Sequence, residues 1–191
     1  MKKFMIASAA AALLVSAGAA NAEILNIDAP YVSVLGGWSS HPALALGAGH
    51  AGVDSGYNAG ARVGAYLSGL PGVSLDADYF HNSGDYIGPN VSHSSDSYMA
   101  DLTYHLPTST PWSLYGGGGI GAVTTSVDGS QYGDSTVFGW QLLGGAEYRL
   151  NDKTAMFAEY RYQNAHNANL DSVANVGNTS NSLSVGVKFN L

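Results

Sequence analysis

Two pairs of opposite charges lie close together in the sequence, and their spacing suits either a structural or a transport role. Glu147 precedes Arg149 by two residues. The same interval separates Glu159 from Arg161. Residues two apart in a β-strand lie on the same face, so each carboxylate is expected beside a guanidinium. If the four groups are buried together they form salt bridges, and if water reaches them they line a path for ions.

Histidines are the other candidates for chemistry, as metal ligands or as general bases. They are His41, His50, His81, His93, His105 and His166. None of them shows the paired spacing of a zinc site, and all except His105 lie in or at the edges of segments with loop composition. We therefore expect solvated histidines in the loops, and neither a metal ion nor a cofactor.

A glycine-rich segment from Gly116 to Gly121 fits the letters of a nucleotide-binding motif, G-x-G-x-x-G. A dinucleotide site needs that motif to open a helix after a parallel strand, whereas the residues that follow here continue as strand and loop. The glycines are instead expected to make room for bulky inward neighbours such as Tyr66, Phe80 and Tyr115.

The stretch that must position the charge pairs runs from Val137 to Gln163 and is predicted to be a β-hairpin. Every second residue from Phe138 to Leu150 is apolar or small, and the residues between them include glycines and both charges of the first pair. After a turn at Asn151 to Thr154 the alternation resumes. A period of two that continues across a turn indicates strands.

The charged face of this hairpin also holds most of its glycines, which suits a crowded interior. The apolar face then points into lipid, as in a membrane barrel. Length and composition agree, because 191 residues allow one domain and 46% are hydrophobic while 11% are charged. Acidic residues outnumber basic ones by 14 to 7, which argues against a nucleic-acid partner. Because the chain has no cysteine, disulfides and thiolate chemistry are excluded.

Other segments alternate in the same way. They are Pro30 to Trp38, Gly60 to Leu67, Val73 to Phe80, Ser97 to Leu106, Trp112 to Ala122 and Leu183 to Leu191. Short turns are expected at Gly69 to Gly72, Pro107 to Pro111 and Asn151 to Thr154, and long loops at Ser39 to Tyr57, His81 to Asp96, Thr124 to Ser135 and Asn164 to Ser180. The predicted fold is all-β: an eight-stranded antiparallel transmembrane up-and-down β-barrel with strands of about nine to eleven residues.

The alternation assigns most of the charged side chains to the barrel interior. They are Arg62, Asp76, Asp78, Asp101, Glu147, Arg149, Glu159, Arg161 and Lys188. Eight strands enclose an interior just wide enough for side chains to fill, and buried charges must be paired. We expect a salt-bridged plug, and a narrow gated path for small solutes or ions is the alternative.

The outer wall is predicted to carry an apolar band about 25 Å tall with aromatic residues near its rims. The candidates for these rims are Trp38, Tyr79, Tyr98, Tyr104, Trp112, Trp140, Tyr148, Tyr160 and Tyr162. Residues 1–22 read as a cleaved signal peptide, with Lys2 and Lys3 at its start and Ala20-Asn21-Ala22 as the cleavage site. The barrel domain is then residues 23–191, which contain no apolar run as long as a membrane helix.

On these features the chain resembles the small eight-stranded outer-membrane barrels of the porin family, namely the OmpA-like transmembrane domain and the opacity-type surface proteins. The resemblance rests on Ala146 to Leu150, Ala158 to Tyr162, the glycine-rich strand and the alternating C-terminal strand. It implies the outer membrane of a Gram-negative bacterium, contact with lipid and lipopolysaccharide, and insertion by the barrel-assembly machinery. It also implies a structural or surface role, with four loops outside where any extracellular ligand would bind.

An enzymatic alternative comes from the outer-membrane lipid A deacylases, which are also eight-stranded barrels and carry a His-Ser pair near the outer end of a strand. The comparable region here is Arg161 to Asn169, in which Asn167 follows His166. Asparagine is not a nucleophile that a base can activate. We therefore expect the chain not to be an enzyme.

Overall fold

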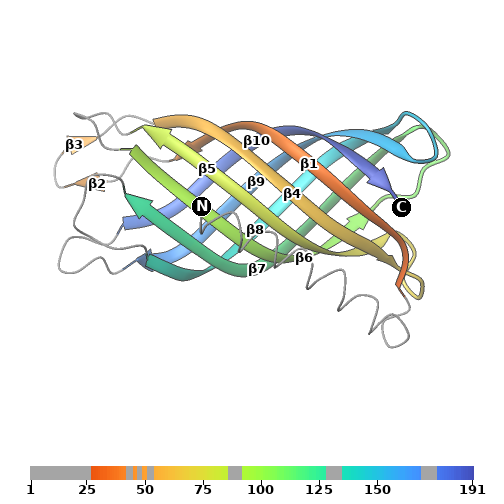
Figure 1. Cartoon of the computed structure of the whole chain (residues 1–191), viewed down its shortest axis with the longest axis horizontal. Coiled ribbons are helices and arrows are strands. Elements are labelled where there is room, and N and C mark those ends of the chain that lie inside the picture. The colour runs from red at the N-terminus through yellow and green to blue at the C-terminus, as the bar shows by residue number, and fades with distance from the viewer. Residues whose placement is uncertain are drawn as a thin grey trace.

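The computed structural model describes residues 27–41, 45–46, 49–50, 54–85, 92–127, 135–168 and 176–191. Within them, strands form a closed barrel in the order β1-β10-β9-β8-β7-β6-β5-β4 (Figure 1). Its strands are β1 (Ile27–His41), β4 (Asp54–Leu67), β5 (Val73–Asp85), β6 (Ser92–His105), β7 (Trp112–Val127), β8 (Ser135–Arg149), β9 (Thr154–Ala168) and β10 (Val176–Asn190). A separate two-stranded sheet pairs β2 (Ala45–Leu46) with β3 (Gly49–His50). Among the described residues, no helix has the length and apolar character needed to cross a membrane.

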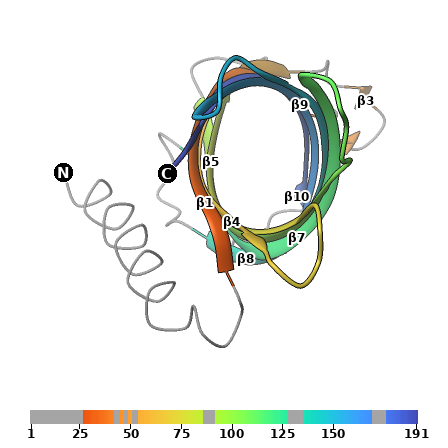
Figure 2. The same cartoon turned by 90° about the vertical axis from the view of Figure 1, so that its right-hand side faces the viewer.

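The first and last barrel strands close the ring. β1 pairs with β10 from Tyr31 opposite Asn190 to Ser40 opposite Asn181, and with β4 on its other side. All pairs are antiparallel, and Figure 2, viewed along the barrel, shows the strands as a ring. Closure lets the backbone groups of each strand pair with a neighbour, as a structure in lipid requires. The predicted fold class is confirmed.

Short turns join the strands at one end of the barrel, which we call the turn end; the opposite end is the loop end. The turns comprise residues 68–72, 106–111 and 150–153, within two residues of the predicted positions. Gly72 has a φ of 81°, and a Cβ atom there would lie 2.5 Å from the carbonyl oxygen of His105. Glycine is therefore required at this position.

The strands are longer than predicted, with 13 to 16 residues each. β5 continues to Asp85 and β6 begins at Ser92, so most of the predicted loop from His81 to Asp96 is strand. The physical reason is that beyond the apolar band both faces of a strand meet polar surroundings. The alternation of hydropathy then disappears, although the backbone ladder continues.

Side chains alternate between the lumen and the outer wall, with charge inside and apolar groups outside. The apolar side chains of the wall that are more than half exposed include Val34, Leu114, Ile120, Leu183 and Val185. By contrast, Arg62 and Asp78 are 5% and 4% exposed. The arrangement is therefore that of a barrel with an apolar outer wall. The predicted signal peptide lies outside the described residues.

The aromatic residues predicted for the rims also lie on the outer wall. Trp38, Tyr104, Trp112, Tyr148 and Tyr160 are exposed there, and several of the predicted aromatic residues form ring pairs between strands. The ring centroids are 5.3 Å apart in the Tyr79–Tyr98 pair, 5.5 Å apart in the Trp140–Tyr162 pair and 4.8 Å apart in the Trp112–Tyr148 pair. Their depth in the membrane stays a prediction.

Candidate functional site

Four charged side chains inside the lumen form a closed set of salt bridges, which we call the charge ring. It consists of Arg62 of β4, Asp78 of β5, and Glu159 and Arg161 of β9. Arg62 Nη2 lies 2.8 Å from Asp78 Oδ2 and 2.9 Å from Glu159 Oε2. Arg161 Nη2 lies 2.8 Å from Asp78 Oδ2 and 2.8 Å from Glu159 Oε1. Each cation therefore contacts both anions, and the formal charges of the ring cancel.

Strand register explains how the charge ring assembles. Arg62 lies directly opposite Asp78 in the β4–β5 ladder, and the period of two places Glu159 and Arg161 on the same face of β9. Every member is buried, with exposed fractions of 1 to 5%. Removing an ion from water costs several kcal/mol, so the ring is tolerable only because its charges are paired.

Uncharged side chains complete the surroundings of the ring. The Tyr115 hydroxyl donates a hydrogen bond of 3.0 Å to Glu159 Oε2. The guanidinium carbon of Arg161 lies 4.1 Å from the centroid of the Phe80 ring, which is a cation–π contact. Gln141 of β8 accepts hydrogen bonds from Arg161 Nη1 at 3.4 Å and from Gln163 Nε2 at 3.2 Å. Sequence reasoning missed Gln141, although it is a polar residue at an inward position of the alternation.

Asp76 and Asp101 also lie inside the lumen, but they do not join the salt bridges as predicted. They face each other across the β5–β6 ladder and are 2% and 0% exposed. Among the described residues, neither forms an ion pair. Neutral donors occupy their oxygens: Thr103 and Ser74 donate to Asp76 at 2.9 and 3.3 Å, and Gln141 donates to both oxygens of Asp101 at 2.7 and 2.9 Å.

Glycines of the neighbouring strands leave the space that these two carboxylates fill. A Cβ atom on Gly64 would lie 2.0 Å from Asp76 Oδ1, and one on Gly119 would lie 1.8 Å from Asp101 Oδ1. The glycine-rich strand β7 therefore accommodates a carboxylate, whereas the sequence predicts that it accommodates aromatic rings.

Replacing Gly145 of β8 with alanine is expected to lower the free energy of unfolding by about 1 to 3 kcal/mol, because the new methyl group overpacks the lumen. Its Cβ atom would lie 2.4 Å from the carbonyl oxygen of Ala158 and 2.6 Å from the Tyr115 ring. Urea titration of the barrel folded in lipid vesicles measures the effect. Gly144→Ala is the matched control, since the nearest atom to its Cβ would be 3.7 Å away. Equal stability of the two variants would contradict this packing.

A second ion pair lies nearer the turn end. Lys188 of β10 pairs with Glu147 of β8, and its Nζ donates a hydrogen bond of 3.2 Å to the Tyr66 hydroxyl. The same Nζ lies 5.1 Å from the centroid of the Tyr31 ring. Both charges are inside the barrel, at positions given by the alternation.

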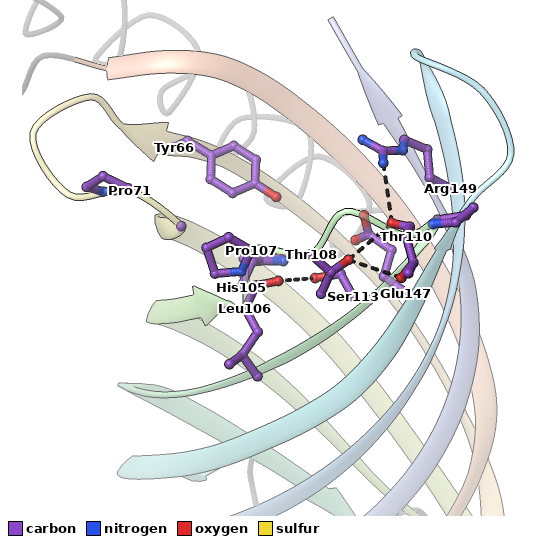
Figure 3. A pocket seen from close by; sticks show the side chains of 12 residues that line it. Tyr66, Pro71, His105, Leu106, Pro107, Thr108, Thr110, Ser113, Glu147 and Arg149 are labelled. Carbon is purple, nitrogen blue, oxygen red and sulfur yellow. Dashed lines mark hydrogen bonds between the residues drawn. The ribbon is translucent and has the colours of Figure 1, made fainter.

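Arg149 was predicted to belong to the interior network and does not. It is the last residue of β8 and is exposed, and its Nη2 donates only to the Thr110 carbonyl oxygen, at 3.4 Å (Figure 3). The strand ends there, so this inward position lies at the mouth of the barrel rather than in the lumen. The mouth is a cavity of about 340 Å³, lined by residues that include Tyr66, His105, Pro107, Ser113, Glu147 and Arg149.

The structure corrects the expectation of a solvated loop position for His81, which lies in a strand and whose Nδ1 is 2.9 Å from Asp96 Oδ1, whereas His105 was expected outside the loops. His105 stacks on the Tyr115 ring with centroids 5.2 Å apart, and His81 belongs to β5. The side chains of His41, His50, His93 and His166 lie outside the described residues. Among the described residues, no group of three or more His, Asp or Glu side chains could hold a metal ion.

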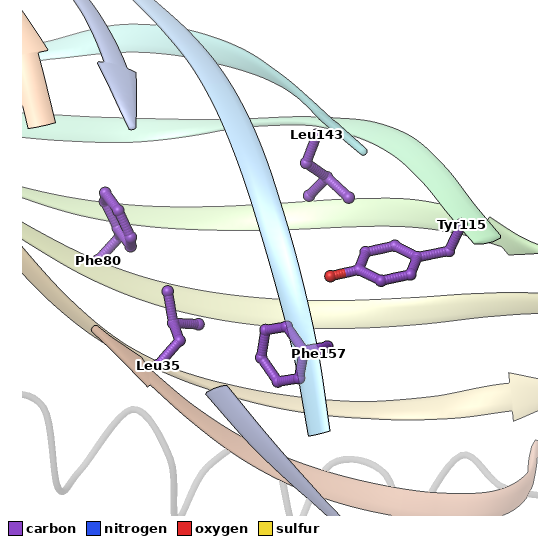
Figure 4. Close-up of a cluster of buried hydrophobic side chains, with 5 residues drawn as sticks. All are labelled: Leu35, Phe80, Tyr115, Leu143 and Phe157. Carbon is purple, nitrogen blue, oxygen red and sulfur yellow. The ribbon is translucent and has the colours of Figure 1, made fainter. Parts of the chain in front are cut away.

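An apolar cluster fills the lumen beside the charge ring; the sequence predicts two of its members, Phe80 and Tyr115, as bulky inward residues, but not the cluster as a whole. Its members are Leu35, Phe80, Tyr115, Leu143 and Phe157, which are 1 to 7% exposed. Figure 4 shows these side chains converging from separate strands. The alternation itself places all five at inward positions, but it does not indicate which of them meet in the lumen.

Comparison with known proteins identifies the architecture. Residues 7–189 match the family model described as the outer membrane protein beta-barrel domain. Neisserial surface protein A has 24% identity and a TM-score of 0.71, with 86% of this chain and 99% of that chain covered. OprG from Pseudomonas aeruginosa has 17% identity and a TM-score of 0.54, with 86% and 97% covered. The N-terminal β-barrel domain of Pseudomonas aeruginosa OprF has 14% identity and a TM-score of 0.53, with 86% and 99% covered. No curated protein sequence matches the chain.

Proposed function

Since the chain belongs to the family of outer membrane protein beta-barrel domains, we propose that it is a closed scaffold that stabilises the membrane and presents its loop end to the outside. The chain is an eight-stranded barrel of the outer membrane, and the proposal concerns what it does there. In bacterial barrels of this type the short turns face the periplasm, which directs the loop end outward. The name of the similar neisserial protein, a surface protein, supports a surface role.

The observation that carries the proposal is the charge ring. Its four side chains are 1 to 5% exposed and bond across the lumen, from β4 and β5 to β9. A passing solute would have to separate these pairs and leave charges unpaired in the interior, which is costly. The apolar cluster next to the ring offers no polar path either. A filled lumen suits a rigid scaffold on which exposed connections carry any binding function.

The partners follow from this role and remain proposals. The outer wall would contact lipid and lipopolysaccharide through its apolar band. The barrel-assembly machinery would insert the chain, as it does other barrels of this membrane. An extracellular ligand, where there is one, would bind at the loop end.

A narrow channel for small solutes or ions is the second candidate function. The cavity of about 340 Å³ at the turn end favours it, because Glu147, the ion-pair partner of Lys188, lines this cavity. The charged lumen would then act as a gate that opens transiently.

Current recordings across a planar lipid bilayer distinguish the two functions. The closed scaffold is expected to give no steady current above that of the empty bilayer, because buried salt bridges fill the lumen. Glu159→Gln, which weakens the charge ring, and Arg149→Gln, which changes only the mouth, are the paired variants. A wild-type current that changes with Glu159→Gln would contradict the scaffold and support the channel.

A further inference from the structure

The mouth of the barrel at the turn end contains an arginine without an acidic partner. The cavity there, of about 340 Å³, is at the lower end of the range for small-molecule sites. Arg149 lines it and forms no ion pair among the described residues. By contrast, Arg62, Arg161 and Lys188 each contact a carboxylate. The unpaired guanidinium therefore has capacity to bind an anion that the chain itself does not supply.

Two side chains of the mouth have hydrogen-bond donors to spare. The guanidinium of Arg149 carries five N–H groups, of which one bonds to the Thr110 carbonyl oxygen, at 3.4 Å. The Tyr66 hydroxyl accepts a hydrogen bond of 3.2 Å from Lys188 Nζ, and its own proton has no acceptor among the described residues. Figure 3 shows the Tyr66 and Arg149 side chains extending toward each other across the mouth. A ligand between them would receive hydrogen bonds from both.

The charge of the mouth indicates how many anionic groups it can take. Glu147 is the acidic residue of the lining, and its charge is cancelled by its ion pair with Lys188. With the imidazole of His105 counted as neutral, the charge that remains is the single positive charge of Arg149. One anionic group on a ligand would neutralise it.

The rest of the lining offers little to a second polar group. The hydroxyls of Thr110 and Ser113 donate to the carbonyl oxygens of Trp112 and Leu106, at 3.1 and 3.0 Å, and Thr108 also donates to Trp112. These protons are therefore not available to a ligand. The remaining surface is mainly apolar and is formed by Pro71, Leu106, Pro107, Pro111 and the rings of Tyr66 and His105. The cavity thus suits one anionic group attached to a compact apolar body.

Backbone hydrogen bonds hold the rim of the cavity in place. The His105 amide donates to the Gly72 carbonyl oxygen at 2.7 Å, and the Arg149 amide donates to the Pro111 carbonyl oxygen at 2.9 Å. The proline rings of the lining also fix their own φ angles. A cavity that is formed before the ligand arrives avoids part of the entropic cost of binding.

We propose that this mouth binds a small organic acid from the periplasm. The carboxylate accepts hydrogen bonds from the guanidinium of Arg149, whose planar fork matches the two carboxylate oxygens, and from the Tyr66 hydroxyl. The apolar body of the acid lies against Pro107 and Pro111. The short turns of such barrels face the periplasm, so the ligand comes from that side. This binding goes beyond the scaffold role and requires no passage through the charge ring.

The test is a titration of the barrel, folded in maltoside micelles, with sodium benzoate as the probe. Saturable shifts of backbone amide NMR signals are expected at lining residues such as Gly72 and Leu106 and not at the loop end. Arg149→Met should weaken binding by a factor on the order of 10 to 10², through loss of hydrogen bonds to a charged group. Arg149→Lys should restore part of the affinity, because it keeps the charge but not the fork. Lys153→Met is the matched control, since Lys153 is an exposed cation of a turn at the same end and is not part of the lining.

Two further probes test the ligand class. Benzamide has the apolar body without the charge, and acetate has the carboxylate without the body. Both should bind more weakly than benzoate by a factor of about 10 or more. Acetate or benzamide binding as tightly as benzoate would overturn the assignment to an organic acid.

The variants decide whether the site is the mouth. The gel mobility of unboiled samples shows that each variant is folded. Absence of saturable shifts in the folded wild-type barrel overturns the proposal, and so does benzoate binding that survives Arg149→Met or is lost with Lys153→Met. These results do not depend on whether the lumen conducts, so the scaffold role is tested separately by the current recordings.

Discussion

Replacing Arg161 with methionine is expected to lower the free energy of unfolding by about 3 to 5 kcal/mol, the cost of removing one partner from a buried ion pair. Arg161 is 1% exposed and contacts both Asp78 and Glu159 at 2.8 Å. Without it, two buried carboxylates share the single guanidinium of Arg62. Urea titration in lipid vesicles, followed by the gel mobility of unboiled samples, measures the loss.

Arg149→Met is the matched control for this variant. It removes the same type of side chain, but the Arg149 side chain is exposed and, among the described residues, donates a single hydrogen bond of 3.4 Å to the Thr110 carbonyl oxygen. Surface substitutions of this kind change stability by about 0.5 kcal/mol or less. If the two methionine variants unfolded at the same urea concentration, the charge ring would not hold the barrel together.

The alternation of hydropathy was sufficient to predict the number of barrel strands, their antiparallel order and the face on which each charge within the predicted strands lies. The period-two alternation indicates whether a side chain faces the lumen or the wall. It therefore placed Arg62, Asp78, Glu159 and Arg161 inside. It does not state which charges meet, because partners across the lumen depend on the closure and stagger of the whole ring. The contact between Arg62 and Glu159, from β4 to β9, is of this kind.

The same limit explains the errors at other positions. Asp76 and Asp101 were predicted to form ion pairs in a salt-bridged plug. The sequence does not reveal the hydroxyl and amide donors that the fold brings to them. The alternation assigns Arg149 to the inward face, but this residue lies at the end of its strand, where the lumen opens. The outward pairing of His81 with Asp96 was hidden because both lie in polar stretches with loop composition.

The apolar cluster was overlooked for a different reason. The alternation places Phe157 and Leu143 on the inward face, but a membrane barrel leads one to expect polar residues there, so an apolar cluster inside the lumen was not predicted. The cluster nevertheless fills the lumen next to the charge ring, and glycine makes room for it: a Cβ atom on Gly186 would lie 2.4 Å from Phe157 Cζ. It should therefore contribute to stability as a conventional core does.

Replacing Phe157 with alanine is expected to lower the free energy of unfolding by about 3 to 5 kcal/mol, through loss of buried apolar surface and creation of a cavity. Phe157 is 7% exposed, and its ring centroid is 6.4 Å from that of Tyr115. Because Gly186 lies beneath the ring, no neighbouring side chain from that position can fill the space. Urea titration in lipid vesicles again provides the measurement.

The controls for this prediction separate the lumen from the wall. Phe138→Ala removes the same type of side chain from the outer face of β8, where Phe138 is 53% exposed. Lipid acyl chains can occupy the space that the ring leaves there. Its effect should be smaller. Phe157→Leu keeps most of the volume and should cost less than about 1.5 kcal/mol. If Phe157→Ala and Phe138→Ala were equally destabilising, lipid contact rather than packing in the lumen would account for the loss, and the lumen would have to be less tightly filled than a closed scaffold requires.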